Sequence, residues 1–290
     1  MNAQSILLVG DKGMLAHAIQ RALDARRLRH TGVDLPECDI TNRESVAASF
    51  DRVRPGVVIN CAAFTNVDGC ETNANVANAV NGTGVGNLAA ACRDHGATLV
   101  HFSTDYVFDG TLRRPLRPDD PVGPASAYGR SKLLGEQLLQ QNAPPRWMII
   151  RTAWLYGPNG ANFPLAILNA AKAGKPLRVV SDQFGSPTFT FDLAEATLEL
   201  LDRGAAGVWH VANGGQTNWH EFASAVLAEF GIDAPVEGIT SGDWAKIKPG
   251  AAVRPAYSVF DLAPVEQLLG RPMAPWRDAL RRYRIAVASA

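Results

Sequence analysis

The chain has 290 residues, of which 47% are hydrophobic, and its 28 basic side chains balance its 28 acidic ones. This balance provides no attraction for nucleic acid or for an anionic membrane, so neither is expected as a partner. No stretch approaches the roughly 20 apolar residues of a membrane helix. The first apolar run, at 6–9, is too short for a signal peptide. We therefore expect a cytoplasmic protein with reduced cysteines.

The first half of the chain alternates between strand and helix patterns. Apolar runs predict strands over 5–9, 29–33, 56–60, 97–103 and 147–151. Helices are predicted between them, near 14–25, 43–53, 71–94 and 126–141. This alternation indicates an α/β fold, a Rossmann-type doubly wound parallel sheet with helices on both faces. Ligands bind such sheets beyond the carboxyl ends of the strands.

The pattern changes near residue 155, where segments become shorter and Pro and Gly more frequent. We expect an NAD(P)-binding Rossmann domain over 1–154 and a smaller, irregular C-terminal substrate-binding region over 155–290. This boundary is not sharp, because the helix expected over 192–203 and the strand expected over 208–212 can return to the main sheet.

The first strand leads directly into a glycine-rich turn and a helix, which is the context of a dinucleotide-binding site. Gly10 permits a tight turn, and Gly13 lets the backbone approach a pyrophosphate at the helix N-terminus. Ala16 allows the helix to pack closely on the strand. The spacing is G-x-x-G-x-x-A, for which a plain strand-to-helix turn is the alternative.

An acidic residue after the second strand holds the cofactor ribose in folds of this kind. Asp34 is the first candidate and Asp39 the second. A carboxylate favours NAD because it repels the 2′-phosphate of NADP. Arg26, Arg27 and Arg29 lie nearby and could attract that phosphate, although basic residues are also common in the last turn of a helix. NADPH and NADH both remain open as the cofactor.

Tyr128 and Lys132 stand four residues apart on a predicted helix, which puts both side chains on one face. A nearby cation lowers the pKa of a tyrosine from about 10, so we expect Tyr128 to act as an acid or base near neutral pH. Thr104 could hydrogen-bond the same reacting oxygen. The alternative is an exposed Tyr and Lys on a solvated helix.

Longer runs resemble the dTDP-4-dehydrorhamnose reductase family of extended short-chain dehydrogenases/reductases, over nearly the whole chain. The most specific runs are Ser-Thr-Asp-Tyr-Val-Phe-Asp-Gly at 103–110 and Asp-Gln-Phe-Gly-Ser-Pro-Thr at 182–188. The resemblance implies that NADPH or NADH reduces the 4-keto group of dTDP-4-dehydro-L-rhamnose to dTDP-L-rhamnose. It makes Tyr128 the proton donor, with Lys132 lowering its pKa and Thr104 holding the carbonyl oxygen.

The same resemblance assigns the binding residues. Those for the cofactor are Gly10, Asp11, Lys12, Gly13, Met14, Leu15, Asp34, Asp39, Ile40, Ala62, Ala63, Phe64, Thr65, Tyr128 and Lys132. Those for the dTDP-sugar are Val67, Thr104, Asp105, Tyr128, Trp154 and Arg254. Arg254 could contact the substrate diphosphate, or it could form a structural salt bridge instead.

We expect a monomer or a homodimer. Some family members form a Mg²⁺-bridged dimer through acidic residues, but Ala18 and Phe191 stand at two of those positions here, so no metal site is expected.

Two other functions stay open. One is another nucleotide-sugar 4-ketoreductase, or an epimerase or dehydratase of the same superfamily, which uses the same Tyr and Lys with tightly held NAD⁺. The other is a non-catalytic, NADP-binding regulatory subunit. The presence of Thr104, Tyr128 and Lys132 together favours an enzyme.

Overall fold

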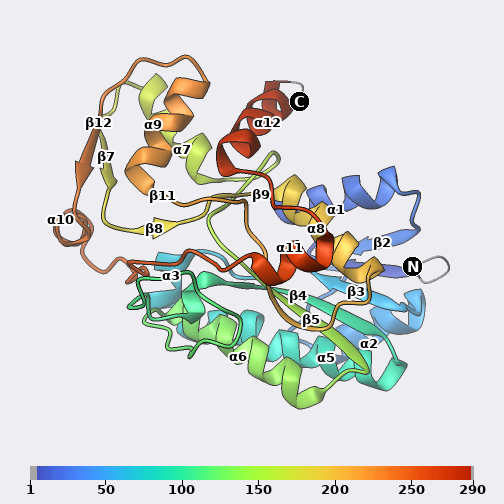
Figure 1. The fold of residues 1–290 in the computed structure, drawn as a ribbon. Coiled ribbons are helices and arrows are strands. Elements are labelled where there is room, and N and C mark those ends of the chain that lie inside the picture. Colours follow the sequence, from blue (N-terminus) through green and yellow to red (C-terminus); the bar gives the residue numbers. More distant parts are fainter. Residues whose placement is uncertain (1–4, 289–290) are drawn as a thin grey trace.

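The structure is a computed structural model that describes residues 5–288, and its centre is a six-stranded parallel sheet (Figure 1). The strand order is β10-β5-β4-β3-β1-β2. The strands are β1 (Ile6–Val9), β2 (His30–Val33), β3 (Val57–Asn60), β4 (Thr98–Thr104), β5 (Arg146–Thr152) and β10 (Gly207–His210). All neighbouring pairs are parallel. The predicted doubly wound α/β fold is confirmed.

Helices cover both faces of this sheet because the strands are apolar on both sides. Ile6 and Leu8 of β1 face a core formed with α1 (Met14–Ala25), α8 (Thr190–Asp202) and α11 (Ala263–Leu269). Leu7 and Val9 face the opposite core, formed with α2 (Arg43–Val53), α5 (Gly84–His95) and α6 (Ala127–Asn142). Burying each such side chain contributes about 1.5–3 kcal/mol, so the alternation along β1 fixes a helical layer on each side.

The segment near 71–94 is helical as predicted, but it is broken at Asn73 and contains a π-helical turn. The chain there forms α3 (Val67–Thr72), α4 (Ala74–Ala77), a π-helical turn η1 (Asn78–Thr83) and then α5. Asn73 leaves helical geometry, with φ −124° and ψ 42°. π-Helical turns occur mostly as short bulges at functional sites, and this one lies against α6.

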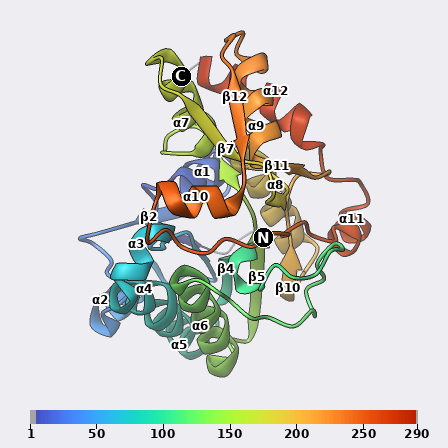
Figure 2. The same ribbon diagram turned by 90° about the vertical axis from the view of Figure 1, so that its left-hand side faces the viewer.

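The remaining elements belong largely to the C-terminal half and gather at one end of the sheet (Figure 2). They are η2 (Asp105–Val107), α7 (Phe163–Lys172), α9 (Trp219–Glu229), α10 (Ser241–Ile247), α12 (Trp276–Ala288) and three two-stranded sheets. These sheets pair β7 (Leu177–Val180) with β12 (Val236–Ile239), β8 (Phe184–Gly185) with β11 (Thr217–Asn218), and β6 (Leu155–Tyr156) with β9 (Thr188–Phe189).

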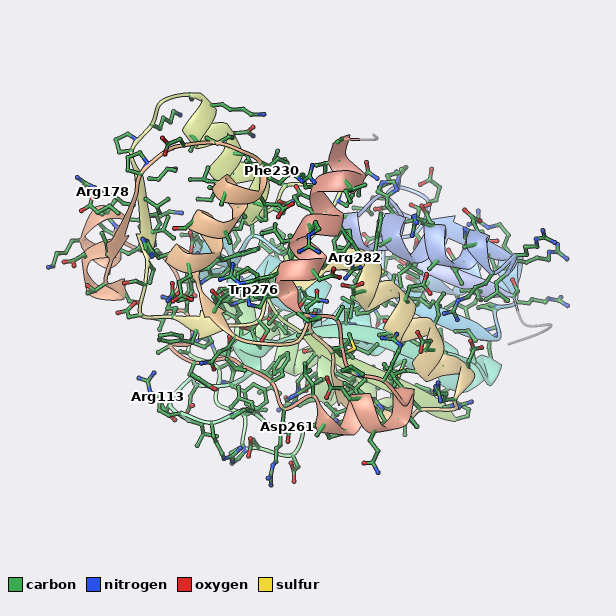
Figure 3. The ribbon with its side chains drawn as sticks, turned by 45° about the horizontal axis from the view of Figure 1, so that its top comes forward. Arg113, Arg178, Phe230, Asp261, Trp276 and Arg282 are labelled. Atoms are coloured by element: carbon green, nitrogen blue, oxygen red, sulfur yellow. The ribbon has the colours of Figure 1, made fainter. Side chains whose placement is uncertain are left out.

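The segment near 192–212 does return to the main sheet: β10 pairs with β5, and α8 packs on α1. Helix α12, which carries Trp276 and Arg282 (Figure 3), is tied to this layer by ion pairs between Arg282 and Asp192 of α8. The C-terminal elements are therefore anchored directly to the helical layer of the sheet. No described helix has both the length and the apolar character needed to cross a membrane.

Candidate active site

The carboxyl ends of four parallel strands meet at one edge of the sheet. Gly10 follows β1, Asn60 ends β3, Thr104 ends β4 and Thr152 ends β5. The parallel register aligns Thr104 with Thr152 directly. This is the edge at which ligands bind in open parallel sheets.

Helix α6 begins beside this edge and carries Tyr128 in its first turn. Ser126 caps the helix, its hydroxyl accepting from the Gly129 N–H at 3.1 Å. The Ala127 N–H donates to the Glu71 carboxylate at 2.8 Å. A Cβ at Gly129 would lie 2.2 Å from the Tyr106 carbonyl oxygen. The glycine inside the Tyr128–Lys132 motif therefore lets the helix approach the loop after β4.

The Tyr128 phenol has two neighbours at this edge. Its ring packs edge-on against Tyr106, with centroids 5.4 Å apart, and its side chain hydrogen-bonds Thr104. Burial raises the pKa of Tyr128, and the charge of Asp105 raises it further, while the bond with Thr104 lowers it. The predicted lowering of this pKa by Lys132 is wrong for this structure, because desolvation outweighs the favourable contacts. The phenol is therefore protonated at neutral pH.

Lys132, one turn later, points into the protein and is only 3% exposed. Its Nζ donates to the Phe102 carbonyl oxygen at 2.7 Å and lies 3.4 Å from Nε2 of His101. Burial lowers the pKa of Lys132 to about 8, while the charge of Glu136 acts in the opposite direction. Lys132 thus exchanges a proton closer to neutrality than a surface lysine does.

Asp105 supplies a carboxylate beside the phenol. One of its oxygens accepts from the Thr104 hydroxyl at 3.1 Å, and the other is buried without a hydrogen-bond partner among the described residues. Burial raises the pKa of Asp105 to about 6, although the nearby hydroxyls of Ser258 and Thr104 lower it. A buried acceptor without a partner is uncommon in folded proteins, so it suits a hydroxyl of a bound ligand.

A pocket of about 290 Å³ lies between the glycine turn and the ends of β2 and β3. Many of the predicted cofactor residues line it: Gly10, Gly13, Asp34, Asp39, Ile40, Ala62, Ala63 and Phe64. The first turn of α1 has no side-chain cap, so its N–H groups are available to an anion.

Gly10 shows that this pocket is shaped for close backbone approach. Its φ is 77°, and a Cβ there would lie 2.6 Å from the Ala62 nitrogen. Only glycine fits both the conformation and the space. With the Asp34 carboxylate at the end of β2, these residues fit a dinucleotide.

The other predicted cofactor residues of this region do not line the pocket. Asp11 packs against Gly32, and Lys12 donates from Nζ to the Leu35 carbonyl at 2.8 Å. Leu15 is part of the core beside β1.

Two more predicted cofactor residues, Met14 and Thr65, also lie outside the lining of the dinucleotide pocket. The sulfur of Met14 accepts from the Asn162 amide at 3.8 Å, and Thr65 is exposed. Arg26 pairs with Glu195 and Asp202 of α8, each at 2.9 Å, which makes it a structural ion pair.

A second cavity, of about 410 Å³, is lined by Tyr106 and by residues of the C-terminal half of the chain. Its lining includes Phe163, Trp219, Trp244, Arg178 of β7 (Figure 3) and Arg254. Aromatic walls with two guanidinium groups suit a ligand that combines a planar ring with negative charge.

The predicted substrate residues lie around this cavity to different degrees. Trp154 stacks on Trp219, with ring centroids 3.6 Å apart and an interplanar angle of 9°. Arg254 lines the cavity and also forms the alternative salt bridge, to Asp68 at 3.2 Å. Val67 begins α3, next to that aspartate.

Asn81 is a residue of this region that the sequence analysis missed. It is fully buried in η1, and its amide accepts from the Phe64 N–H at 2.8 Å and donates to the Phe64 carbonyl at 3.0 Å. It also donates to Ser131 of α6 at 3.0 Å. Asn81 thus fastens the loop of the dinucleotide pocket to the helix that carries Tyr128. In the sequence it was visible only as part of a helical pattern.

Among residues 5–288, no group of three or more His, Cys, Asp or Glu could hold a metal ion. At the two positions considered for a bridging metal, Ala18 is buried and the Phe191 ring lies under the Arg21 guanidinium at 4.4 Å.

A Rossmann sheet with a glycine cradle beside Thr104, Tyr128 and Lys132 defines an oxidoreductase of the extended short-chain type. The family model described as "RmlD substrate binding domain" matches residues 4–288, and the chain belongs to that family.

Several similar proteins agree with this assignment. A Streptomyces griseus protein named dTDP-4-dehydrorhamnose reductase is 40% identical over 94% of this chain and 91% of its own. A Streptomyces niveus protein named dTDP-4-keto-6-deoxy-D-glucose reductase is 39% identical over 94% of both. A solved dTDP-4-dehydrorhamnose reductase from Bacillus anthracis, in complex with NADP, has a TM-score of 0.92 at 32% identity, covering 97% of this chain and 99% of that one. These relatives confirm the expected oxidoreductase, and the NADP complex agrees with the expected cofactor.

Proposed function

We propose that this protein reduces the 4-keto group of dTDP-4-dehydro-L-rhamnose to dTDP-L-rhamnose with NADPH or NADH. The position of Tyr128 carries the proposal. Its ring packs with Phe64 of the dinucleotide pocket in one small apolar cluster and touches Tyr106 of the second cavity. These neighbours on both sides support a role for the phenol between a cofactor bound in one pocket and a sugar nucleotide bound in the other.

The site residues divide between cofactor and substrate. Gly10 and Gly13 would hold the pyrophosphate at the start of α1, and Asp34 the adenosine ribose. On the substrate side, Arg254 would meet the diphosphate, and the free oxygen of Asp105 would accept a sugar hydroxyl.

When bound, the dihydronicotinamide supplies a hydride to the carbonyl carbon. Negative charge then develops on the carbonyl oxygen, where preorganised donors are most effective. Tyr128 donates its proton to that oxygen, and the Thr104 hydroxyl would donate a hydrogen bond to it in place of its bond to Asp105. Because burial raises the pKa of Tyr128, the phenol is held in the protonated form that a reduction consumes. Lys132 would bind the nicotinamide ribose from the next turn of α6.

A second candidate is the reduction of a different dTDP-4-keto-6-deoxysugar. The Streptomyces niveus relative, 39% identical, is named for such a substrate. The two substrates differ in ring stereochemistry, which the residues around Tyr128 would have to distinguish.

Both candidates are tested by adding each keto sugar nucleotide with NADPH or NADH, following nicotinamide absorbance and identifying the product by NMR. We expect dTDP-L-rhamnose and stoichiometric cofactor oxidation. An epimerase or dehydratase would leave added NADPH unchanged, and a regulatory subunit would bind it without turnover. Failure to form rhamnose with both cofactors would refute the main proposal.

The role of Tyr128 is tested by Tyr128→Phe, which should lower kcat by about 10²–10⁴, the usual contribution of a general acid. The matched control is Tyr106→Phe, which removes the neighbouring hydroxyl but keeps the edge-on ring contact. Cofactor affinity should survive in both variants. Near-normal turnover in Tyr128→Phe would remove this residue from the mechanism.

A further inference from the structure

Behind Lys132, a row of buried polar side chains leads away from the substrate cavity. Nε2 of His101 lies 3.4 Å from Lys132 Nζ, and Nδ1 of His101 lies 3.2 Å from the Asn60 amide nitrogen. The Asn60 oxygen accepts from the Ala62 N–H at 3.0 Å. Lys132, His101 and Asn60 are 3%, 0% and 1% exposed. We call these three residues the buried row.

The hydrogen bonds of the buried row fix the tautomer of His101. The Ala62 N–H needs an acceptor, so the Asn60 oxygen faces Ala62 and the Asn60 NH₂ faces His101. Nδ1 of His101 must then accept. Burial lowers the pKa of His101 well below its usual range, so the ring is neutral. A neutral imidazole that accepts at Nδ1 carries its proton on Nε2.

This tautomer decides which form of Lys132 fits. The Nε2–H of His101 points at Lys132 Nζ, and an ammonium has three donors but no lone pair to accept that proton. A neutral amine can accept from His101 and still donate to the Phe102 carbonyl at 2.7 Å. The hydrogen bonds of the buried row therefore favour the neutral amine form of Lys132 over the ammonium form.

We propose that His101 is a positioning residue for Lys132, which holds Nζ through its Nε2–H and favours the amine form in the cofactor-free protein. The importance of this for turnover rests on the function proposed above. The row ends at the Ala62 backbone, and all three members are buried. It therefore does not deliver protons from solvent, and its effect is on the position and protonation of Lys132.

Other charged and titratable groups facing Lys132 do not replace this effect. Glu136, one turn along α6, favours the ammonium, but its carboxylate is already engaged by Arg151 of β5 at 2.7 Å and by the Ser103 hydroxyl. The Cys61 thiol follows β3, and burial raises its pKa, so it stays neutral. Tyr128, one turn earlier on α6, is protonated.

The first test needs no substitution in the measured protein. Long-range ¹H–¹⁵N NMR of the histidine-labelled, cofactor-free chain reports the tautomer of each of its six histidines. The His101 signals are identified by their loss in His101→Gln. The expected result is a neutral Nε2–H tautomer at neutral pH. An Nδ1–H tautomer would overturn the proposal, whether or not any variant folds.

The second test follows the protonation of Lys132 through its labelled Cε and Nζ, assigned with Lys132→Arg. In His101→Gln an amide oxygen can accept from the ammonium, so the titration midpoint should rise by about one pH unit, the scale of one charge-assisted hydrogen bond. The matched control is His210→Gln, since His210 is also buried and, within residues 5–288, its Nδ1 hydrogen-bonds the Leu116 carbonyl and not Lys132. In His210→Gln the titration midpoint of Lys132 should equal that of the wild type.

An unchanged midpoint in His101→Gln would contradict the proposal. Neither test depends on turnover, so its outcome is separate from that of the proposed reaction. A normal reductase with an unchanged midpoint would refute only the role of His101. A shifted midpoint without any reductase activity would refute only the proposed reaction.

Discussion

Asn81→Ala tests whether the π-helical turn serves the site. The substitution removes the amide that bonds both backbone groups of Phe64 and the Ser131 hydroxyl. Asn81 is fully buried, with 0% of its surface accessible to water. The Phe64 groups therefore lose their partner inside the protein, and the loop loses its link to α6.

The loss of stability in Asn81→Ala follows from the two Phe64 backbone groups that lose their hydrogen-bond partner. Each buried donor or acceptor left without a partner costs about 1–3 kcal/mol, so the two Phe64 groups together imply a loss of about 3 kcal/mol. For a chain of this length, with an unfolding entropy of about 2.1 cal/mol/K per residue, the expected fall in Tm is roughly 5 °C. The affinity for NADPH should fall as well, because Phe64 lines the dinucleotide pocket.

Urea unfolding and a fluorescence titration with NADPH measure the two effects. The matched control is Asn78→Ala, in the same π-helical turn but at an exposed position. It should change the free energy of unfolding by no more than about 0.5 kcal/mol. If Asn81→Ala unfolds and binds like Asn78→Ala, the turn does not hold the loop and our reasoning is wrong.

Three further variants test the pocket and the buried carboxylate. Gly10→Ala should weaken NADPH binding tenfold or more, measured by titration, whereas Gly174→Ala, also at positive φ but with open space around it, should not. Asp34→Asn should raise the NADPH-to-NADH ratio of kcat/KM by about fivefold, because one charge near a 2′-phosphate is worth about 1 kcal/mol in water; an unchanged ratio would exclude a contact at this position. Burial raises the pKa of Asp105 from 3.8 to about 6, so the folded state binds this proton more tightly and wild-type stability falls as pH rises through that window. Asp105→Asn lacks this loss, so the difference between its free energy of unfolding and that of the wild type should increase by about 2 kcal/mol between pH 4 and pH 7 in urea titrations. A constant difference would contradict the pKa shift.

The sequence predicted the parts of the fold that local pattern determines. The strands from β1 to β5 lie within about a residue of their expected bounds, because each is a short apolar run between turns. The cofactor turn was equally visible, since Gly10 and Gly13 lie between a strand and a helix. The break in the helix expected over 71–94 was not visible. Nor was the π-helical turn, in which Asn81 bonds Phe64 and Ser131, 17 and 50 positions away in the chain.

The direction of the Tyr128 pKa shift also depends on tertiary contacts that a sequence pattern does not show. The spacing of Tyr128 and Lys132 correctly places both on α6, and it suggested that the cation lowers the pKa of the phenol. The tertiary structure directs Nζ instead to the Phe102 carbonyl and His101, and places Asp105 near the phenol. Desolvation and a carboxylate then raise the pKa, which no spacing rule includes. Tyr128 therefore holds its proton at neutral pH, as the proposed ketone reduction would require of a proton donor.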